Sequence, residues 1–202
     1  MDIWLNKIEK TSLKRKKEKK KIESEVFDKE VLKTIAYFMN KKIIKTLDFP
    51  ISKGKEAYVF RATTPEGKYL AVKIYMIETS LFKNMFEYIH GDKRFRGVKK
   101  KKKDLVYAWA RKEFRNLKIC EEANVSAPRP IAVKNNVIIM EFIGDEFPAP
   151  LLKDVGPINP ERDFNQIIEE IKKLYQKDLI HADISEYNIL VKDKLYLIDV
   201  GQ

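Results

Sequence analysis

The hydrophobic positions along the chain follow a helical period in three stretches. Between Glu25 and Met39 apolar residues recur every three or four positions, which predicts an amphipathic helix. These residues are Phe27, Val31, Ile35 and Phe38. Residues 104–122 show the same period, and so does the stretch after Asn159-Pro160, a pair typical of a helix N-cap and first turn. The apolar face of this last helix is expected to carry Phe164, Ile167, Ile168, Ile171 and Leu174.

Short apolar runs between these helices predict strands. The runs are residues 57–60, 70–75, 130–133, 137–142, 188–191 and 195–198. Turn-forming residues separate them in pairs, and each pair therefore reads as an antiparallel hairpin. The resulting order is helix, strands, helix, strands, helix and a short hairpin. It predicts an α+β protein in which a small sheet-rich lobe adjoins a helical lobe across a cleft.

Changes in composition divide the chain into four segments. We expect residues 1–24 to form a basic, flexible arm and residues 25–48 to form an N-terminal helical extension. Residues 49–142 are expected to form the small β-rich lobe, with a long flexible loop at 79–103. Residues 143–202 form the connection between the lobes and the helical lobe.

Net charge and cysteine content narrow the range of partners and compartments. The chain has 41 Lys and Arg residues against 30 Asp and Glu, so its formal charge is 41 − 30 = +11, which favours phosphate-rich partners such as RNA or ATP. The basic run at 14–21 suits an RNA-binding arm and a merely solvated tail equally well. Cys120 is the only cysteine, which fits a reducing cytoplasm. We expect no membrane partner, because the sequence has neither a signal peptide nor an apolar run of spanning length.

The most informative chemistry lies near the end of the chain. Asp183 precedes Asn188 by five residues, and Asp199 follows eleven residues later. Protein kinases space a catalytic Asp, a metal-holding Asn and a metal-holding Asp in this way. The hairpin between Asn188 and Asp199 would bring both side chains together, and such oxygen ligands suit Mg²⁺. Asp183 is then the candidate base that orients or accepts the proton of a substrate hydroxyl.

A lysine and a glutamate far apart in the sequence support this interpretation. Lys73 lies within an apolar strand and is expected to reach into the cleft toward the phosphates of ATP. Glu113 lies on the apolar stripe of the helix at 104–122, where an unpaired carboxylate would be costly. A Lys73–Glu113 ion pair would satisfy both groups.

Two further segments complete a predicted nucleotide site. Residues 52–59 match the glycine-rich pattern G-x-G-x-x-G-x-V with Gly54 retained, and small residues let the backbone approach phosphates. At the junction of the lobes, the Glu141 carbonyl and the Ile143 amide would bind the edge of adenine, with Met140 behind it. The expected nucleotide-binding residues are Ser52, Lys53, Gly54, Ala57, Val59, Ala71, Lys73, Glu113, Met140, Glu141 and Ile143.

Taken together, these motifs make the chain resemble the RIO family of atypical protein kinases, most closely its first, archaeal-type subgroup. The stretches that carry the resemblance are residues 52–57, 91–96, 112–117, 140–144, 148–150, 181–188 and 198–202. The resemblance implies a bilobal protein-kinase-like fold that uses ATP with Mg²⁺ or Mn²⁺. It also implies serine/threonine kinase activity toward a protein or toward the chain itself, ATPase activity, and a role in maturing the small ribosomal subunit, with its pre-ribosomal RNA as a partner.

The resemblance assigns further roles and reveals departures. It implies that Asp199 accepts a transient phosphate, and that Ser80 is the autophosphorylated serine of the flexible loop. Ala182 stands where ordinary kinases have an Arg, so activation through a phosphorylated loop docking on that Arg is not available. The chain stops at Gln202, whereas the family usually continues with further helices, which implies a truncated helical lobe.

Two other functions remain open on the sequence. The chain could be a non-catalytic, ATP-gated RNA-binding assembly factor, or a small-molecule phosphotransferase with a kinase-like fold. The joint presence of Lys73, Asp183, Asn188 and Asp199 favours a catalyst, because a pure scaffold has no physical use for all four.

Overall fold

The computed structural model describes residues 26–77 and 102–201. The predicted arm at 1–24, and the predicted loop at 79–103 except for its last two residues, lie outside the described residues, as does Ser80. Residues 102 and 103 already belong to a helix, so the predicted end of the loop is wrong by two residues.

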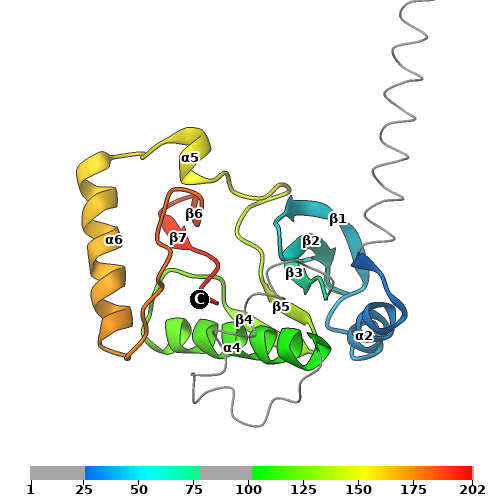
Figure 1. Ribbon diagram of the computed structural model, residues 1–202. Coiled ribbons are helices and arrows are strands. Elements are labelled where there is room, and N and C mark those ends of the chain that lie inside the picture. Colours follow the sequence, from blue (N-terminus) through cyan, green and yellow to red (C-terminus); the bar gives the residue numbers. More distant parts are fainter. Residues whose placement is uncertain (1–25, 78–101, 202) are drawn as a thin grey trace, which may run out of the picture.

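A five-stranded antiparallel sheet forms one part of the molecule (Figure 1). Its spatial order is β1-β2-β3-β5-β4. The strands are β1 (Thr46–Lys53), β2 (Ala57–Thr63), β3 (Tyr69–Tyr75), β4 (Pro130–Lys134) and β5 (Val137–Glu141). The structure confirms the predicted strands at 57–60, 70–75, 130–133 and 137–142 to within a few residues.

Strand β1 was not predicted, and its first residues had been assigned to the helical extension at 25–48. It carries Pro50 and pairs with β2 through two register shifts. Its half-buried apolar residues, Leu47, Phe49 and Ile51, alternate with more exposed ones except at Asp48, which is also half-buried and pairs with Arg61 at 2.9 Å. Proline is tolerated at a sheet edge, where one side of the strand has no ladder to complete.

Helix α2 (Lys29–Asn40) covers one face of this sheet. Asp28 caps it by accepting hydrogen bonds from the backbone amides of Glu30 and Val31 at 2.9 and 2.7 Å, so the helix begins later than its apolar pattern suggested. Val31, Ile35 and Phe38 are buried as predicted, in a cluster shared with β2, β3 and β5. Phe27 precedes the helix, and its ring centre lies 5.4 Å from that of Phe60.

Helix α4 (Lys102–Glu122) connects the sheet with the second part of the molecule (Figure 1). Its buried residues share one hydrophobic cluster with Ile138 of β5 and with Leu174 and Leu197 from the second part. This cluster buries Val106, Ala110, Leu117 and Cys120, which lie on the apolar stripe of α4, and leaves Trp109 half-buried. A single rigid helix therefore holds side chains that face both parts.

The second part consists of α5 (Leu152–Val155), α6 (Pro160–Tyr175), β6 (Ile189–Val191) and β7 (Leu195–Leu197). Asn159 caps α6 as predicted by accepting a hydrogen bond from the Arg162 amide at 3.0 Å. Strands β6 and β7 form the predicted hairpin. No helix among residues 26–77 and 102–201 is both long enough and apolar enough to span a membrane.

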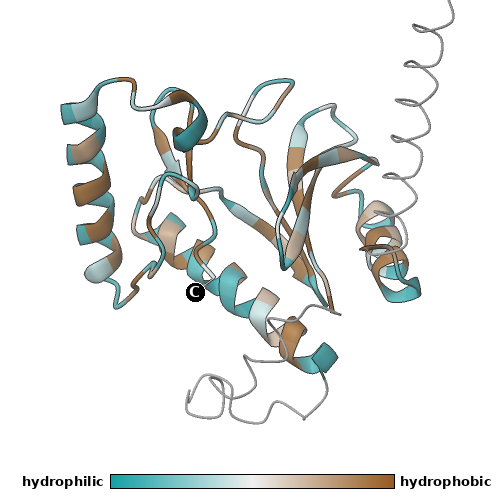
Figure 2. Cartoon of the chain, turned by 45° about the horizontal axis from the view of Figure 1, so that its top comes forward, coloured by the Kyte–Doolittle hydropathy of each residue, from teal (hydrophilic) through white to brown (hydrophobic). Residues whose placement is uncertain are grey.

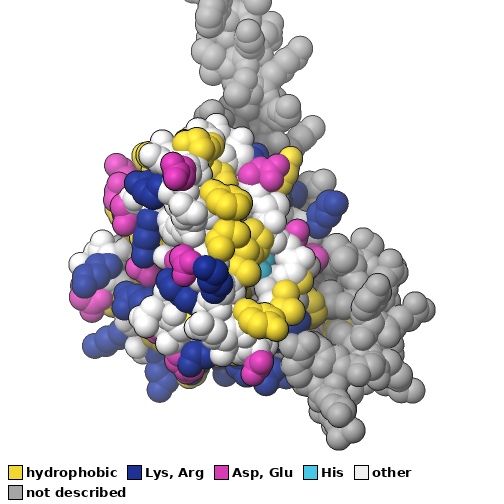
Figure 3. Space-filling model, turned by 90° about the vertical axis from the view of Figure 1, so that its left-hand side faces the viewer, with side chains coloured by type: hydrophobic (Ala, Val, Ile, Leu, Met, Phe, Trp, Pro, Cys, Tyr) yellow, Lys and Arg dark blue, Asp and Glu magenta, His cyan; other side chains and the backbone are white. Residues whose placement is uncertain are grey.

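The prediction for the apolar face of α6 is wrong in part. Leu174 is buried, whereas Phe164 is 62% exposed and Ile171 is 39% exposed. The helix alternates hydrophobic and hydrophilic positions (Figure 2), and hydrophobic side chains lie in a strip on the surface of this side of the molecule (Figure 3). Helix α6 contacts β7 and the turn that carries Ser126, and these neighbours cover only one side of it among the described residues.

Candidate active site

A cavity of about 670 Å³ lies between the sheet and the second part of the molecule. All eleven residues expected to bind the nucleotide line it, together with both expected metal-binding residues, Asn188 and Asp199. Asp183 is not part of the lining, but its carboxylate accepts a hydrogen bond from Asn188 Nδ2 at 2.8 Å. Residues far apart in the sequence, from Ile51 to Asp199, thus meet at one site.

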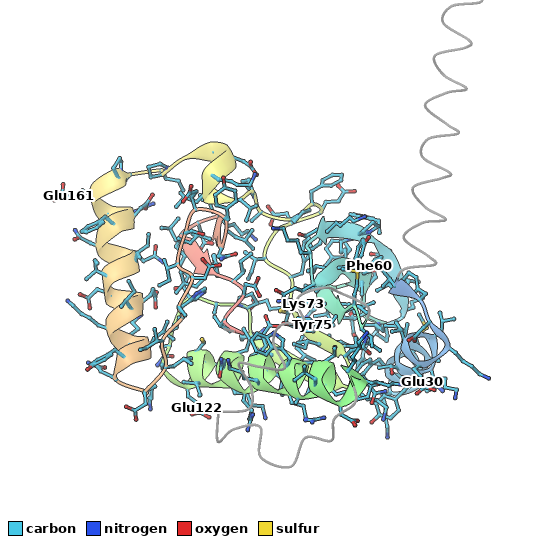
Figure 4. The ribbon with its side chains drawn as sticks, in the orientation of Figure 1. Glu30, Phe60, Lys73, Tyr75, Glu122 and Glu161 are labelled. Carbon is cyan, nitrogen blue, oxygen red and sulfur yellow. The ribbon has the colours of Figure 1, made fainter. Side chains whose placement is uncertain are left out.

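Lys73 lies at the centre of this site, between the sheet and α4 (Figure 4). Its Nζ donates to Glu113 Oε1 at 2.7 Å and to Asp199 Oδ1 at 2.8 Å. Lys73 is 7% exposed and Glu113 only 1%, so the ion pair predicted from the sequence is present and buried. Lys73 therefore joins β3, α4 and the segment after β7 through one ammonium group.

The charges around Lys73 determine its protonation. Burial alone would lower the pKa of Lys73, but the charges of Glu113 and Asp199 outweigh burial and hold this pKa well above its ordinary value. The Lys73 charge in turn lowers the pKa of Asp199, against the effect of burial. The Asp199 side chain is 48% exposed, so solvent screens part of this attraction. Both groups are ionised at neutral pH.

The hairpin β6–β7 positions Asn188 and Asp199 at its open end. The Ile198 amide donates to the Asn188 carbonyl at 3.0 Å, which places Asn188 beside the residue preceding Asp199. Asn188 Nδ2 also donates to the Asp183 backbone carbonyl at 2.9 Å. The amide oxygen of Asn188 is consequently the atom available for a cation. One amide and one carboxylate fit Mg²⁺ when phosphate oxygens and water supply its other ligands.

Two residues of this region adopt left-handed backbone conformations. Ala182 has a φ angle of 66° and Asp199 one of 65°. Such angles are uncommon for residues other than glycine and often mark functional positions. His181, which precedes Ala182, is 3% exposed, and its Nε2 lies 2.9 Å from the carbonyl oxygen of Ile198, the residue before Asp199. This contact with the backbone agrees with a structural role for His181.

The glycine-rich segment forms the tight turn between β1 and β2. The Gly54 amide donates to the Ala57 carbonyl at 2.9 Å, and a Cβ atom at Gly54 would lie only 3.3 Å from that oxygen. Glu56, which the sequence reasoning did not select, is half-buried in the cavity lining. Burial and the nearby Asp199 charge raise its pKa.

The hinge segment, residues 141–150, is held by contacts from both parts of the molecule. Arg61 of β2 donates from Nη1 to the Glu146 carbonyl at 2.5 Å. From the other side, Lys192 Nζ donates to the Gly144 carbonyl at 2.9 Å. Within the segment, the Ala149 amide donates to the Ile143 carbonyl at 2.9 Å. These bonds maintain the spacing of the two walls of the cavity.

Asn116 is a further residue that sequence reasoning missed. It lies one helical turn after Glu113 on α4 and is 5% exposed. Its Nδ2 donates to the Val200 carbonyl at 2.6 Å. Gly201 also packs closely against α4, since a Cβ atom at this position would lie 3.4 Å from Glu113 Cβ. Helix α4 therefore fixes both the partner of Lys73 and the backbone that follows Asp199.

We expect Asn116→Ala to lower the free energy of unfolding by about 1–3 kcal/mol, because the buried Val200 carbonyl would lose its donor. Urea denaturation measures this change. Asn165→Ala is the control, since Asn165 is exposed on α6, and its replacement should change stability by less than about 0.5 kcal/mol. Equal stability of the two variants would show that the bond to Val200 contributes nothing.

The chain is similar to known structures and sequences. A crystal structure of the Rio2 kinase–ADP/Mg²⁺–phosphoaspartate complex from Chaetomium thermophilum superposes with a TM-score of 0.64 over 83% of this chain and 51% of that chain, at 23% identity. This likeness establishes the kinase-like α+β fold that the sequence predicted.

Sequence comparison identifies the family as well as the fold. The chain is 40% identical over 184 residues to the RIO-type serine/threonine-protein kinase Rio1 of Haloferax volcanii, a match over 90% of this chain and 63% of that protein. It is 43% identical over 176 residues to Rio1 of Methanocaldococcus jannaschii, over 86% of this chain and 60% of that protein. The chain thus spans somewhat less than two thirds of the length of these relatives. Residues 58–202 match the family model described as the RIO domain. The chain therefore belongs to the RIO family of serine/threonine protein kinases.

Proposed function

We propose that this protein is an ATP- and Mg²⁺-dependent enzyme of the RIO type, which transfers the γ-phosphate of ATP to a serine hydroxyl, including its own, or to water. The observation that carries the proposal is the position of Lys73 between Glu113 and Asp199 in the cavity, at 2.7 and 2.8 Å. The names of the curated relatives and the ADP/Mg²⁺ complex of the structural neighbour support it.

The proposal assigns roles to the main polar residues and backbone groups of the cavity. Residues 52–57 and Lys73 bind the phosphates, and the Glu141 carbonyl and Ile143 amide bind adenine. Asn188 and Asp199 hold Mg²⁺, which screens the phosphate charge when it is bound. Lys73 is anchored by Glu113, so it can contact a phosphate in place of Asp199 without losing its position.

Asp183 and Asp199 are the residues proposed to act on the reacting atoms. Asp183 is exposed beside the cavity and hydrogen-bonded to Asn188, where it can orient an attacking hydroxyl or water and accept its proton. Asp199 is ionised and partly exposed, as a nucleophile needs to be. In the route through Asp199, an oxygen of its carboxylate bonds to the γ-phosphorus of ATP, and the bond between this phosphorus and the oxygen that bridges to the β-phosphorus breaks. ADP leaves, and water later hydrolyses the aspartyl-phosphate and releases phosphate. The phosphoaspartate in the Rio2 complex supports this route through Asp199.

The proposed biological setting is maturation of the small ribosomal subunit, in the cytoplasm, with pre-ribosomal RNA as a partner. The net charge of +11 supports a phosphate-rich partner. The basic runs at 14–21 and 99–103 are the proposed RNA contacts.

The function is tested with the wild-type chain and radiolabelled ATP. We expect release of ADP that stops when EDTA removes divalent cations, because Asp199 is itself negatively charged and Asn188 is neutral, so the phosphate charge has to be balanced by a bound cation. The label should appear on serine in the protein or as free phosphate. Label found only on an added aminoglycoside would instead identify a small-molecule phosphotransferase. ATP binding without turnover, with or without small-subunit particles, would identify a non-catalytic assembly factor.

A further inference from the structure

Tyr75 makes a contact at the site that the motifs do not predict. It is the last residue of β3 and lies on the same face as Lys73, since residues two apart in a strand point to the same side (Figure 4). Its hydroxyl donates to Glu113 Oε2, while Lys73 donates to Oε1 of the same carboxylate. The two oxygens of Glu113 are thus divided between two side chains of one strand.

Tyr75 also contacts Lys73 directly. Lys73 Nζ lies 5.0 Å from the centre of the Tyr75 ring, a distance at which a cation is attracted to an aromatic face. Burial and the Glu113 charge hold the pKa of Tyr75 well above its ordinary value. The hydroxyl therefore keeps its proton at neutral pH and remains a donor to Glu113.

The backbone of Tyr75 is fixed on both sides. Its amide donates to the Asn136 carbonyl at 2.9 Å, and its carbonyl accepts from Asn136 Nδ2 at 2.6 Å. Asn136 is 1% exposed in the turn between β4 and β5. Because Tyr75 itself is 2% exposed, its hydroxyl has little freedom to leave Glu113.

The hydrogen bond from Tyr75 to Glu113 is more specific than packing of a buried tyrosine would require. Any buried acceptor would satisfy a tyrosine that only filled the core. The acceptor here is the carboxylate that holds Lys73, and Lys73 has a second partner in Asp199. When a nucleotide and Mg²⁺ occupy the cavity, Asp199 is needed at the cation, and Glu113 becomes the remaining anchor of Lys73.

We propose that Tyr75 is a positioning residue, which holds Glu113 Oε2 so that Oε1 stays directed at Lys73 while Lys73 contacts the nucleotide. This inference rests on the proposed function, because it assumes that Lys73 binds nucleotide phosphates. It adds a residue through which the sheet itself, and not only α4, determines the position of the Lys73–Glu113 pair.

The first test compares Tyr75→Phe with the wild type. We expect the affinity for MgADP and kcat/KM for ATP to fall about tenfold or more, mainly through KM, because Lys73 would contact phosphates already present in the ground state. Tyr196→Phe is the matched control. It also removes a tyrosine–carboxylate hydrogen bond, that of Tyr196 to Asp193 at 3.0 Å, but outside the cavity lining. Its nucleotide affinity should stay within about twofold of the wild type.

The second test is a double-mutant cycle that combines Tyr75→Phe with Glu113→Gln, in which the affinity for MgADP is measured. If Tyr75 acts through Glu113, then Tyr75→Phe should lower affinity by less than about twofold in the Glu113→Gln background. An equal loss in both backgrounds would overturn the proposal. Circular dichroism verifies that each variant is folded.

A third measurement covers the case in which Tyr75→Phe does not fold. In protein labelled with ¹³C at tyrosine Cζ, the Tyr75 signal should titrate at lower pH in Glu113→Gln than in the wild type, and the Tyr196 signal should not differ. An unchanged Tyr75 titration would contradict the coupling.

A wild type that does not bind MgADP would overturn the proposed function, whereas a wild type that binds it as tightly as Tyr75→Phe would overturn only the role of Tyr75.

Discussion

Asp183→Ala and Asp199→Asn should each lower Mg²⁺-dependent ATP turnover by a factor of about 10² to 10⁴. Asp183 is the proposed base, and its loss leaves the attacking hydroxyl or water without an acceptor for its proton. Asp199 is both the proposed metal ligand and the proposed phosphate acceptor. Asparagine suits the second test because it tolerates the left-handed backbone at this position while it removes the negative charge.

The two variants should retain the fold, which separates this result from simple unfolding. Asp183 is exposed and hydrogen-bonds through its side chain to Asn188. Asp193→Ala is the matched control, since Asp193 is an exposed carboxylate in the turn of the same hairpin, and its turnover should equal that of the wild type. Turnover that is unchanged in both Asp183→Ala and Asp199→Asn would end the enzymatic assignment.

Lys73→Met should cause the largest loss of stability of any single change in the cavity. It leaves Glu113, which is 1% exposed, without its cation, and breaking a buried ion pair in this way costs about 3–5 kcal/mol. ATP turnover should disappear as well, because the proposed phosphate contact is lost. Chemical denaturation and turnover assays measure the two effects. Lys172→Met is the control, since Lys172 pairs with Glu169 at 2.6 Å on the surface, and its loss should cost less than about 1 kcal/mol.

The penalty of Lys73→Met should also depend on pH. In the wild type, Lys73 lowers the pKa of Asp199. A carboxyl group whose folded pKa is depressed contributes stability above its unfolded pKa, and this contribution is lost as the pH falls through the folded value. The variant lacks the contribution at every pH. The stability difference between wild type and variant should therefore stay nearly constant from pH 7 to about pH 5 and narrow below about pH 4, as the pH falls from the ordinary pKa of Asp199 through its lower folded value. A difference that stays constant would mean that Asp199 gains nothing from Lys73.

Some elements of the fold were less predictable than others. Helix α6 was found from its cap at Asn159 and its period, yet two of its predicted core residues, Phe164 and Ile171, are exposed. Periodicity identifies an apolar face but does not say which neighbours will cover it. Strand β1 was missed although Leu47, Phe49 and Ile51 alternate with other residues along it, and this alternation is the signal that could have found it. Pro50 within the run counts against a strand, because proline is accommodated only at the edge of a sheet.

The candidate site shows the same division between local and distant information. Local sequence determined the hairpin that carries Asn188 and Asp199, because its turn and its two strands are neighbours in the chain. It also indicated the Lys73–Glu113 pair, since a glutamate on an apolar helical stripe needs a cation. Only the tertiary structure brought Lys73 to Asp199, 126 residues away, and Tyr75 to Glu113. The physical reason is that such contacts depend on how β3, α4 and the hairpin pack together, and no periodicity within a single segment encodes the distance between segments.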